Sequence, residues 1–277
     1  MTGSSIDWIR VLVSLLFLGY ASWSDLRSRE VNDFVWVVFA PAGFLLTVLS
    51  IYLARDWALL AVFGVYAGFM IVLSVALFYF GVFFAEADAK ALICLSLAMP
   101  WYPVATPVHP LVSFVQPLLP LSALANGVLV EAGSIFYLLS RNIVWKFRTG
   151  GKLFGGFENI PLWKKLILLL IGYKVEIPEA EKKIYLYPLE DIEVKGRTAV
   201  PVLRIFVTHK EDRDMLVRKL KQYASGEKLS RRIWVTLGLP LIVFITIGFV
   251  LALLFGDIIF WIIFQVLGRW VERSTPF

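Results

Sequence analysis

The sequence is poor in the side chains that most metalloenzymes and thiol enzymes depend on. Its 277 residues include one cysteine and two histidines. A single cysteine, Cys94, excludes an intramolecular disulfide and a tetracysteine zinc site. Cys94 lies inside an apolar run, so we expect it to be a small buried hydrophobic residue. We predict no metal site and no other cofactor.

Charge is also scarce. Charged residues make up 17% of the chain and hydrophobic residues 59%, with a mean hydropathy of +0.76. This composition excludes an ordinary soluble globule and is typical of a polytopic membrane protein. The opening MTGSSID has no basic residue, and the apolar run that follows is long enough to span a bilayer. We therefore expect a first transmembrane helix there and not a cleavable signal.

Apolar runs predict six transmembrane helices, because a spanning helix needs about 20 apolar residues. The runs lie at about 7–24, 34–54, 57–79, 88–102, 117–143 and 233–255. The fourth is short and contains Pro100. The tail after the sixth has too few apolar residues for a seventh span, and we expect an interfacial or re-entrant helix there.

The chain between the fifth and sixth runs is different in composition. Residues 146–232 hold 19 basic and 11 acidic residues, a net charge of +8, and the remainder carries −2. Such a basic surface next to membrane spans favours anionic lipid headgroups over nucleic acid as its partner. The fold class predicted is an α-helical polytopic membrane protein with a small α+β domain inserted before the last helix. Its parts are 1–144 (membrane domain), 145–232 (basic insert), and 233–277 (last helix and interfacial segment).

The insert shows strand patterns and one clear helix. KVEIP, KIYLYPL, DIEVKG and VPVLRIFVT are rich in β-branched and aromatic residues and predict four strands, and residues 209–226 predict a helix that ends at Gly226. The stretch PLWKKLILLLIGYK is amphipathic and predicts either a helix on the inner leaflet or a core helix of the insert. The insert contains no P-loop or GxGxxG motif.

The distribution of basic residues predicts the orientation, since short cytoplasmic loops accumulate lysine and arginine. Arg27, Arg29, Lys90 and the insert lie on one side, whereas the opposite loops carry only Arg55. We therefore expect a multi-pass protein of the plasma membrane with its insert in the cytoplasm and both termini outside. Of the two histidines, His109 is expected outside and His209 inside, too far apart to act together.

Two aspartates are placed for chemistry. Asp25 ends the first predicted span and Asp88 begins the fourth, and the orientation puts both on the cytoplasmic side. Two carboxylates can catalyse peptide hydrolysis if one takes a proton from water and the other donates a proton to the carbonyl oxygen. A solvated helix end for Asp25 and a plain N-terminal cap for Asp88 are the structural alternatives.

Three further charged residues lie near or within the spans. Glu86 and Lys90 are four residues apart and predict a salt bridge on a helix. Glu131 lies inside the fifth span, where an acid is expensive and indicates function, although a hydrogen bond to Asn126 or to another group of the helix bundle is the simpler interpretation. A proton or ion path through Asp88, Lys90 and Glu131 would instead make the chain a transporter.

The motifs SDLRSREVNDFVW and EADAKALICLSL, with the later LWKKLILLLIGYKVE and RRIWVTLGLPLIVFITIGFV, resemble the archaeal preflagellin and prepilin peptidases. These are GxGD-type aspartic membrane proteases related to the bacterial type IV prepilin peptidases. The resemblance places Asp25 and Asp88 on the catalytic aspartates and Lys90 on the lysine of the second motif. It implies an aspartic endopeptidase that cleaves the short basic leader of archaellin or type IV pilin-like precursors.

The chain departs from this family pattern at the second motif, where Ala85 and Ala87 replace the two glycines of G-x-G-D with Glu86 between them. Glycine would permit a positive φ that alanine disfavours, so a non-catalytic pilin-binding protein is a further alternative. Glu30 and Asp33, in the loop after Asp25, are candidates for attracting the basic leader; the simpler interpretation is a solvated loop.

Overall fold

The chain forms two compact units in a computed structural model. Unit 1 consists of Met1–Ala132 and Pro240–Phe277, and unit 2 consists of Gly133–Leu239. The structure describes residues 2–81, 85–103, 118–151, 153–155, 157–195, 198–204, 213–224, 232–238 and 240–274. Both histidines, and with them their predicted separation, lie outside these residues.

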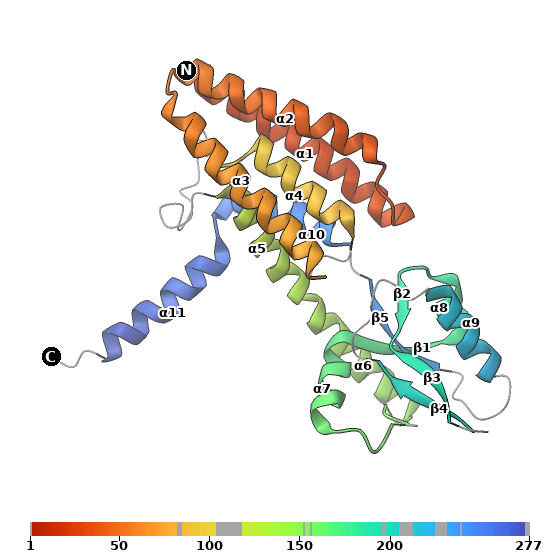
Figure 1. The fold of residues 1–277 in the computed structure, drawn as a ribbon. Helices are drawn as coiled ribbons and strands as arrows, with labels where there is room; N and C mark the ends of the chain where they lie inside the picture. The colour runs from red at the N-terminus through yellow and green to blue at the C-terminus, as the bar shows by residue number, and fades with distance from the viewer. Residues whose placement is uncertain are drawn as a thin grey trace. The chain divides into compact units, whose positions relative to one another are not determined.

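Unit 1 is a bundle of helices (Figure 1). Its elements are α1 (Thr2–Ser28), α2 (Asp33–Ala54), α3 (Ala58–Tyr79), α4 (Glu86–Ala98), α5 (Leu119–Ala132), α10 (Leu241–Phe255) and α11 (Ile258–Ser274). Helices long and apolar enough to span a bilayer lie at Ser5–Ser28, Asp33–Ala54, Ala58–Tyr79 and Leu119–Thr149, and the bent pair α10–α11 adds a fifth if it counts as one span. The protein is therefore a multi-pass membrane protein, but the described residues do not confirm six spans.

Helix α4 is one of the six predicted spans that the structure does not confirm. The sequence predicts a span at 88–102, but α4 has 13 residues, a length of about 20 Å at 1.5 Å per residue, which does not cross a core of about 30 Å. The last carbonyl groups of α4 accept hydrogen bonds from buried polar side chains. Arg10 Nε donates to Ala98 O at 2.9 Å, and Thr47 Oγ1 donates to Leu97 O at 2.7 Å. Since these groups would otherwise lack partners, α4 can end inside unit 1.

Helices α5 and α10 approach closely because glycines face the partner backbone. A Cβ atom on Gly248 would lie 2.0 Å from Ala123 O, and one on Gly127 would lie 2.7 Å from Phe244 O. Small residues permit this approach between membrane helices. Gly127 is late in α5 and Phe244 is early in α10, so the two helices are antiparallel.

The junction of α10 and α11 is a fixed bend of 61°. Gly256 has φ +77° and ψ −151°, a conformation essentially restricted to glycine. Asn126 of α5 holds the bend, because its Nδ2 donates to Gly256 O at 2.8 Å and its Oδ1 accepts from Ile258 N–H at 3.0 Å. The bent pair is a broken span or a re-entrant segment; the sequence predicts a re-entrant or interfacial helix for the tail.

Unit 2 has an α+β fold. Its helices are α6 (Ser134–Thr149), α7 (Leu162–Ile171), α8 (Ile177–Lys182) and α9 (Arg213–Ala224), and its strands are β1 (Gly172–Glu176), β2 (Leu186–Pro188), β3 (Glu190–Lys195), β4 (Thr198–Leu203) and β5 (Arg232–Leu237). An antiparallel sheet has the order β1-β5-β2, and β3 and β4 form a separate antiparallel pair. Strands occur at the four positions that the sequence predicts, except that α8 replaces the end of the first. Residues 205–208 of the fourth predicted strand, and both ends of the predicted helix 209–226 that contains α9, lie outside the described residues.

Strand β5 corrects the predicted start of the last span. The sequence predicts one helix over 233–255, but residues 232–237 pair with β1 and β2, and α10 begins only at Leu241, after Pro240. Ile233, Trp234 and Val235 are fully buried. A short apolar run has the same composition in a buried strand and in a membrane helix, so periodicity alone does not separate the two.

Two buried carboxylates at the start of β3 bind polar groups of other elements of unit 2. Glu190 Oε1 accepts a hydrogen bond from Trp234 N–H at 2.7 Å, and burial raises the pKa of Glu190 to about 7. Burial acts in the same direction on Asp191, but its hydrogen bond from Lys219, at 2.7 Å, helps to lower the pKa of Asp191 below its ordinary value. Arg204 also pairs with Asp191, at 2.6 Å. These bonds connect β3 to β5 and α9.

Replacing Gly248 by valine should disrupt the packing of α5 against α10, because the new side chain would overlap the Ala123 carbonyl. We expect a loss of roughly 1–3 kcal/mol of stability, measured as a lower melting temperature of the purified protein. Gly64→Val is the matched control, since a Cβ on Gly64 meets nothing within 4 Å. Equal melting temperatures for the two variants would contradict this account of the helix contact.

Candidate active site

Asp25 lies in the last turn of α1, where α1 meets α10. The backbone N–H of Arg29, at φ +60°, donates to Asp25 O at 3.0 Å and ends the helix. Three residues before Asp25, the Ser22 hydroxyl lies 2.8 Å from the hydroxyl of Thr246 on α10. Asp25 itself is half-buried. The end of α1 is thus fixed against the first turns of α10 with its carboxylate partly open to solvent.

Asp88 lies in the first turn of α4 and is only 3% exposed. Its Oδ2 accepts a hydrogen bond from Ala85 N–H at 3.2 Å, and its carboxylate also interacts with the backbone N–H of Ile242 in the first turn of α10. Helix N-termini carry partial positive charge and unpaired N–H groups. Asp88 therefore has two sources of stabilisation for a negative charge in an otherwise apolar interior.

The structure brings Asp25 and Asp88 together although 63 residues separate them in the chain. The charge of Asp25 acts on the Asp88 carboxyl, and so does the charge of Glu131 at the end of α5. In a low dielectric, like charges oppose one another, so Asp25 and Glu131 both disfavour a negative charge on Asp88. Within the described residues, no three His, Cys, Asp or Glu side chains are arranged to hold a metal ion.

Glu131 is the residue whose place in the site the sequence did not predict. Asn126, its expected hydrogen-bond partner, is occupied instead by the backbone of the α10–α11 bend. Glu131 lies four residues beyond Gly127 on α5, hence on the helix face that packs against α10. The one sequence signal for it is an acid in an apolar run, which marks a candidate but does not say which helix it meets.

Ala85 and Ala87 adopt conformations that need no glycine. Ala85 precedes α4 with φ −115° and ψ 142°, which is ordinary extended backbone, and Ala87 lies within the helix. Among the described residues, the positive φ values belong to Arg29 and Arg55 and to three glycines. In the described part of the chain around Asp88, residues 85–103, the backbone conformation at Ala85 and Ala87 is therefore one that alanine adopts without strain.

Lys90 lies apart from the three carboxylates, on the exposed side of α4. Its Nζ is 2.7 Å from Glu86 Oε1, as the i,i+4 spacing predicts, and 2.7 Å from Asp33 Oδ1 at the start of α2. Glu30 is exposed, and its backbone O accepts hydrogen bonds from the hydroxyls of Ser24 and Ser28. Asp33 is thus engaged with Lys90, whereas the Glu30 side chain extends into solvent.

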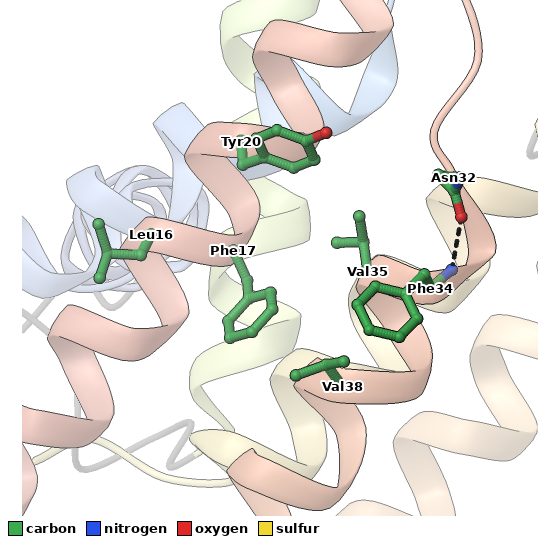
Figure 2. Close-up of a pocket in the computed structure, with 7 residues that line it drawn as sticks. All are labelled: Leu16, Phe17, Tyr20, Asn32, Phe34, Val35 and Val38. Carbon is green, nitrogen blue, oxygen red and sulfur yellow. Dashed lines mark hydrogen bonds between the residues drawn. The ribbon is translucent and has the colours of Figure 1, made fainter.

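A separate apolar groove runs between α1 and α2 (Figure 2). It has a volume of about 560 Å³ and is lined by Leu16, Phe17, Tyr20, Asn32, Phe34, Val35 and Val38. Figure 2 shows the Asn32 side chain turned to the backbone of Phe34, whose N–H donates to Asn32 Oδ1 at 2.9 Å. None of the three carboxylates lines this groove, so it offers apolar surface and no acid–base groups.

Comparison with known families matches most of the chain in two parts. Residues 12–139 match the type IV leader peptidase family, and residues 164–258 match the archaeal peptidase A24 C-terminus, type II. The first match includes both Asp25 and Asp88, and the second runs from α7 through α10.

Curated relatives cover nearly the whole chain. Preflagellin peptidases of Methanococcus maripaludis and Methanococcus voltae are 27% and 26% identical over 90% of this chain and 96% of theirs. The preflagellin peptidase of Methanocaldococcus jannaschii is 23% identical over 94% of this chain and 99% of its own. With these relatives and the two family matches, the chain belongs to the type IV leader peptidase family, in its archaeal form, and is a membrane protease.

Proposed function

We propose that this protein is an aspartic endopeptidase that removes the short basic leader from archaellin or type IV pilin-like precursors at the cytoplasmic membrane face. The observation that carries the proposal is the meeting of Asp25 and Asp88 in one partly buried site. Relatives named preflagellin peptidases support the substrate class.

The two aspartates have complementary surroundings for this chemistry. Asp88 is nearly inaccessible and bound by backbone N–H groups, whereas Asp25 is half-buried and open to water. In the reaction, the ionised member takes a proton from the attacking water while the protonated member donates to the carbonyl oxygen of the scissile bond. If the pair holds one proton, one carboxyl is ionised while the other is protonated. Whichever of the two is ionised acts as the base.

Basic residues support a cytoplasmic location for the site. Arg27 and Arg29 follow Asp25 in the chain, Lys90 follows Asp88, and the basic segment 146–232 carries a net charge of +8. The positive-inside rule places such segments in the cytoplasm. A precursor with a cytoplasmic leader and an apolar helix in the membrane would present its scissile bond at this level.

Glu30 is the better candidate of the two loop acids for binding a basic leader. Glu30 and Asp33 both lie in the loop region after Asp25, but Asp33 already pairs with Lys90. The Glu30 carboxylate is exposed and follows the helix end that carries Asp25. It therefore has the charge and accessibility to attract a lysine or arginine of the leader, through an interaction that salt screens.

Exchanging either aspartate for asparagine should abolish cleavage. Asp25→Asn and Asp88→Asn keep the side-chain shape but remove proton transfer, so we expect a loss of at least about 100-fold in the initial rate, measured with purified enzyme and a preflagellin precursor. Glu86→Gln is the matched control, because Glu86 is exposed in the same turn as Asp88. Wild-type rates for both aspartate variants would refute the dyad; loss in Glu131→Gln but not in Asp25→Asn would assign the second carboxyl to Glu131.

Restoring glycine before Asp88 should leave the activity nearly unchanged. Ala85 and Ala87 occupy conformations that alanine adopts readily, so Ala85→Gly and Ala87→Gly should cleave at close to the wild-type rate. Ala87→Gly should lower stability by less than about 1 kcal/mol, the cost of glycine in a helix interior, since Ala87 lies in the first turn of α4. The measurements are initial cleavage rates and melting temperatures. A large gain in rate with either glycine would show that the alanines restrain the site.

Removing the charge of Glu30 should weaken substrate capture without slowing the chemical step. We expect Glu30→Gln to raise KM for a precursor with a basic leader at low salt and to leave kcat unchanged, with the difference vanishing at high salt. A precursor whose leader charges are neutralised is the matched control, because it should not distinguish the variant from the wild type. An equal KM for both enzymes at low salt, or a fall in kcat, would contradict this role.

A further inference from the structure

Helix α7 exposes an apolar stripe although it belongs to the most basic part of the chain. Leu162 is 77% exposed, Leu166 61% and Trp163 55%, with Leu170 also exposed. At about 100° per residue, these four side chains fall within an arc of about 100° on one face of the helix. The opposite face packs inward, because Leu168 is buried in a cluster with Phe157, Leu189 and Trp234. Helix α7 therefore has one face packed in the interior of unit 2 and an exposed face that is apolar.

Two lysines border the stripe, one on each side. Lys164 Nζ lies 5.4 Å from the centre of the Trp163 ring, and Lys165 Nζ donates to Glu158 O at 2.7 Å. An ammonium has three donors, so Lys165 keeps donors for a further acceptor. Lysines that flank an apolar stripe extend along it and place their charges at headgroup level when the stripe is immersed.

Helix α7 is fixed beside the end of a candidate transmembrane helix. Asn142 of α6 is buried, and its Nδ2 donates to Leu169 O at 3.2 Å and to Gly172 O at 2.8 Å at the end of α7. The candidate span Leu119–Thr149 includes α6 and ends seven residues after Asn142, or about 10 Å further along the helix. Lys146 and Arg148 lie in its last turn, as expected where a helix leaves the membrane on the cytoplasmic side.

Helix α6 also exposes apolar side chains. Its exposed apolar side chains are Phe136, Ile143, Val144 and Phe147. They share one face of α6, opposite Asn142, by the same 100° geometry. An apolar surface that begins on a candidate span and carries basic residues at its end is suited to lipid and not to water.

We propose that α7 lies in the headgroup layer of an anionic membrane surface, with its leucines and Trp163 in the acyl boundary and its two lysines toward lipid phosphates. This interaction anchors unit 2 independently of the peptidase activity. The occupant is lipid and not another protein, because the stripe adjoins a candidate span and the flanking charges match anionic headgroups.

The test measures where the stripe lies in the full-length protein. In a Cys94→Ala background, nitroxide labels are attached at Leu166→Cys and, independently, at Leu162→Cys. Met215→Cys on α9 is the matched control, since Met215 is 66% exposed on the same unit. The protein is reconstituted in vesicles of phosphatidylcholine with phosphatidylglycerol, or of phosphatidylcholine alone. Electron paramagnetic resonance then compares collisions of each label with oxygen, which concentrates in the acyl region, and with a water-soluble nickel chelate.

In anionic vesicles we expect both α7 labels to collide with oxygen several-fold more than with nickel, and the Met215→Cys label to show the reverse. In phosphatidylcholine alone the α7 labels should become more accessible to nickel. Nickel accessibility at both α7 sites equal to that of Met215→Cys would overturn the proposal. So would shielding from both reagents, which indicates coverage by a second copy or another protein. Equal immersion in both lipids would reject the role of anionic headgroups.

Discussion

The contact of Asp88 with the first turns of α4 and α10 is the interaction on which the candidate site depends. A carboxylate with 3% exposure is costly unless its negative charge is balanced. Two helix N-termini offset part of this cost through the N–H groups of Ala85 and Ile242. A helix N-terminus can stabilise a buried acid only where a helix starts beside it, as α4 and α10 do at Asp88.

Helix α10 must therefore be held in register, and three contacts do this from different directions. Gly248 and Gly127 allow its backbone to approach α5, and the hydroxyls of Ser22 and Thr246 join it to α1. At its far end, Asn126 holds the bend at Gly256. A shift of α10 along α5 would separate Ile242 from Asp88, so the glycine contacts between α5 and α10 also determine the environment of the reacting groups.

Much of the site could be predicted from the sequence, because it depends on local pattern and on where apolar runs begin and end. Asp25 and Asp88 stand out as acids at the ends of such runs, and the spacing of Glu86 and Lys90 predicts their ion pair. Glu131 could not be assigned a place, because its neighbours come from α4 and α10 by tertiary packing. The length of α4 and the start of α10 were predicted wrongly for a related reason: hydropathy does not distinguish a buried half-length helix or a buried strand such as β5 from a spanning helix.

The two ends of the inserted segment are brought together by the same antiparallel pair of helices. The chain leaves unit 1 after Ala132 and re-enters it at Pro240. Since Gly127 meets Phe244, these two points lie at the same end of the α5–α10 pair, close to Glu131 and Ile242. An insertion whose two ends are adjacent disturbs the parent fold little. Both ends of the insertion thus lie at the end of the α5–α10 pair that carries Glu131 and Ile242.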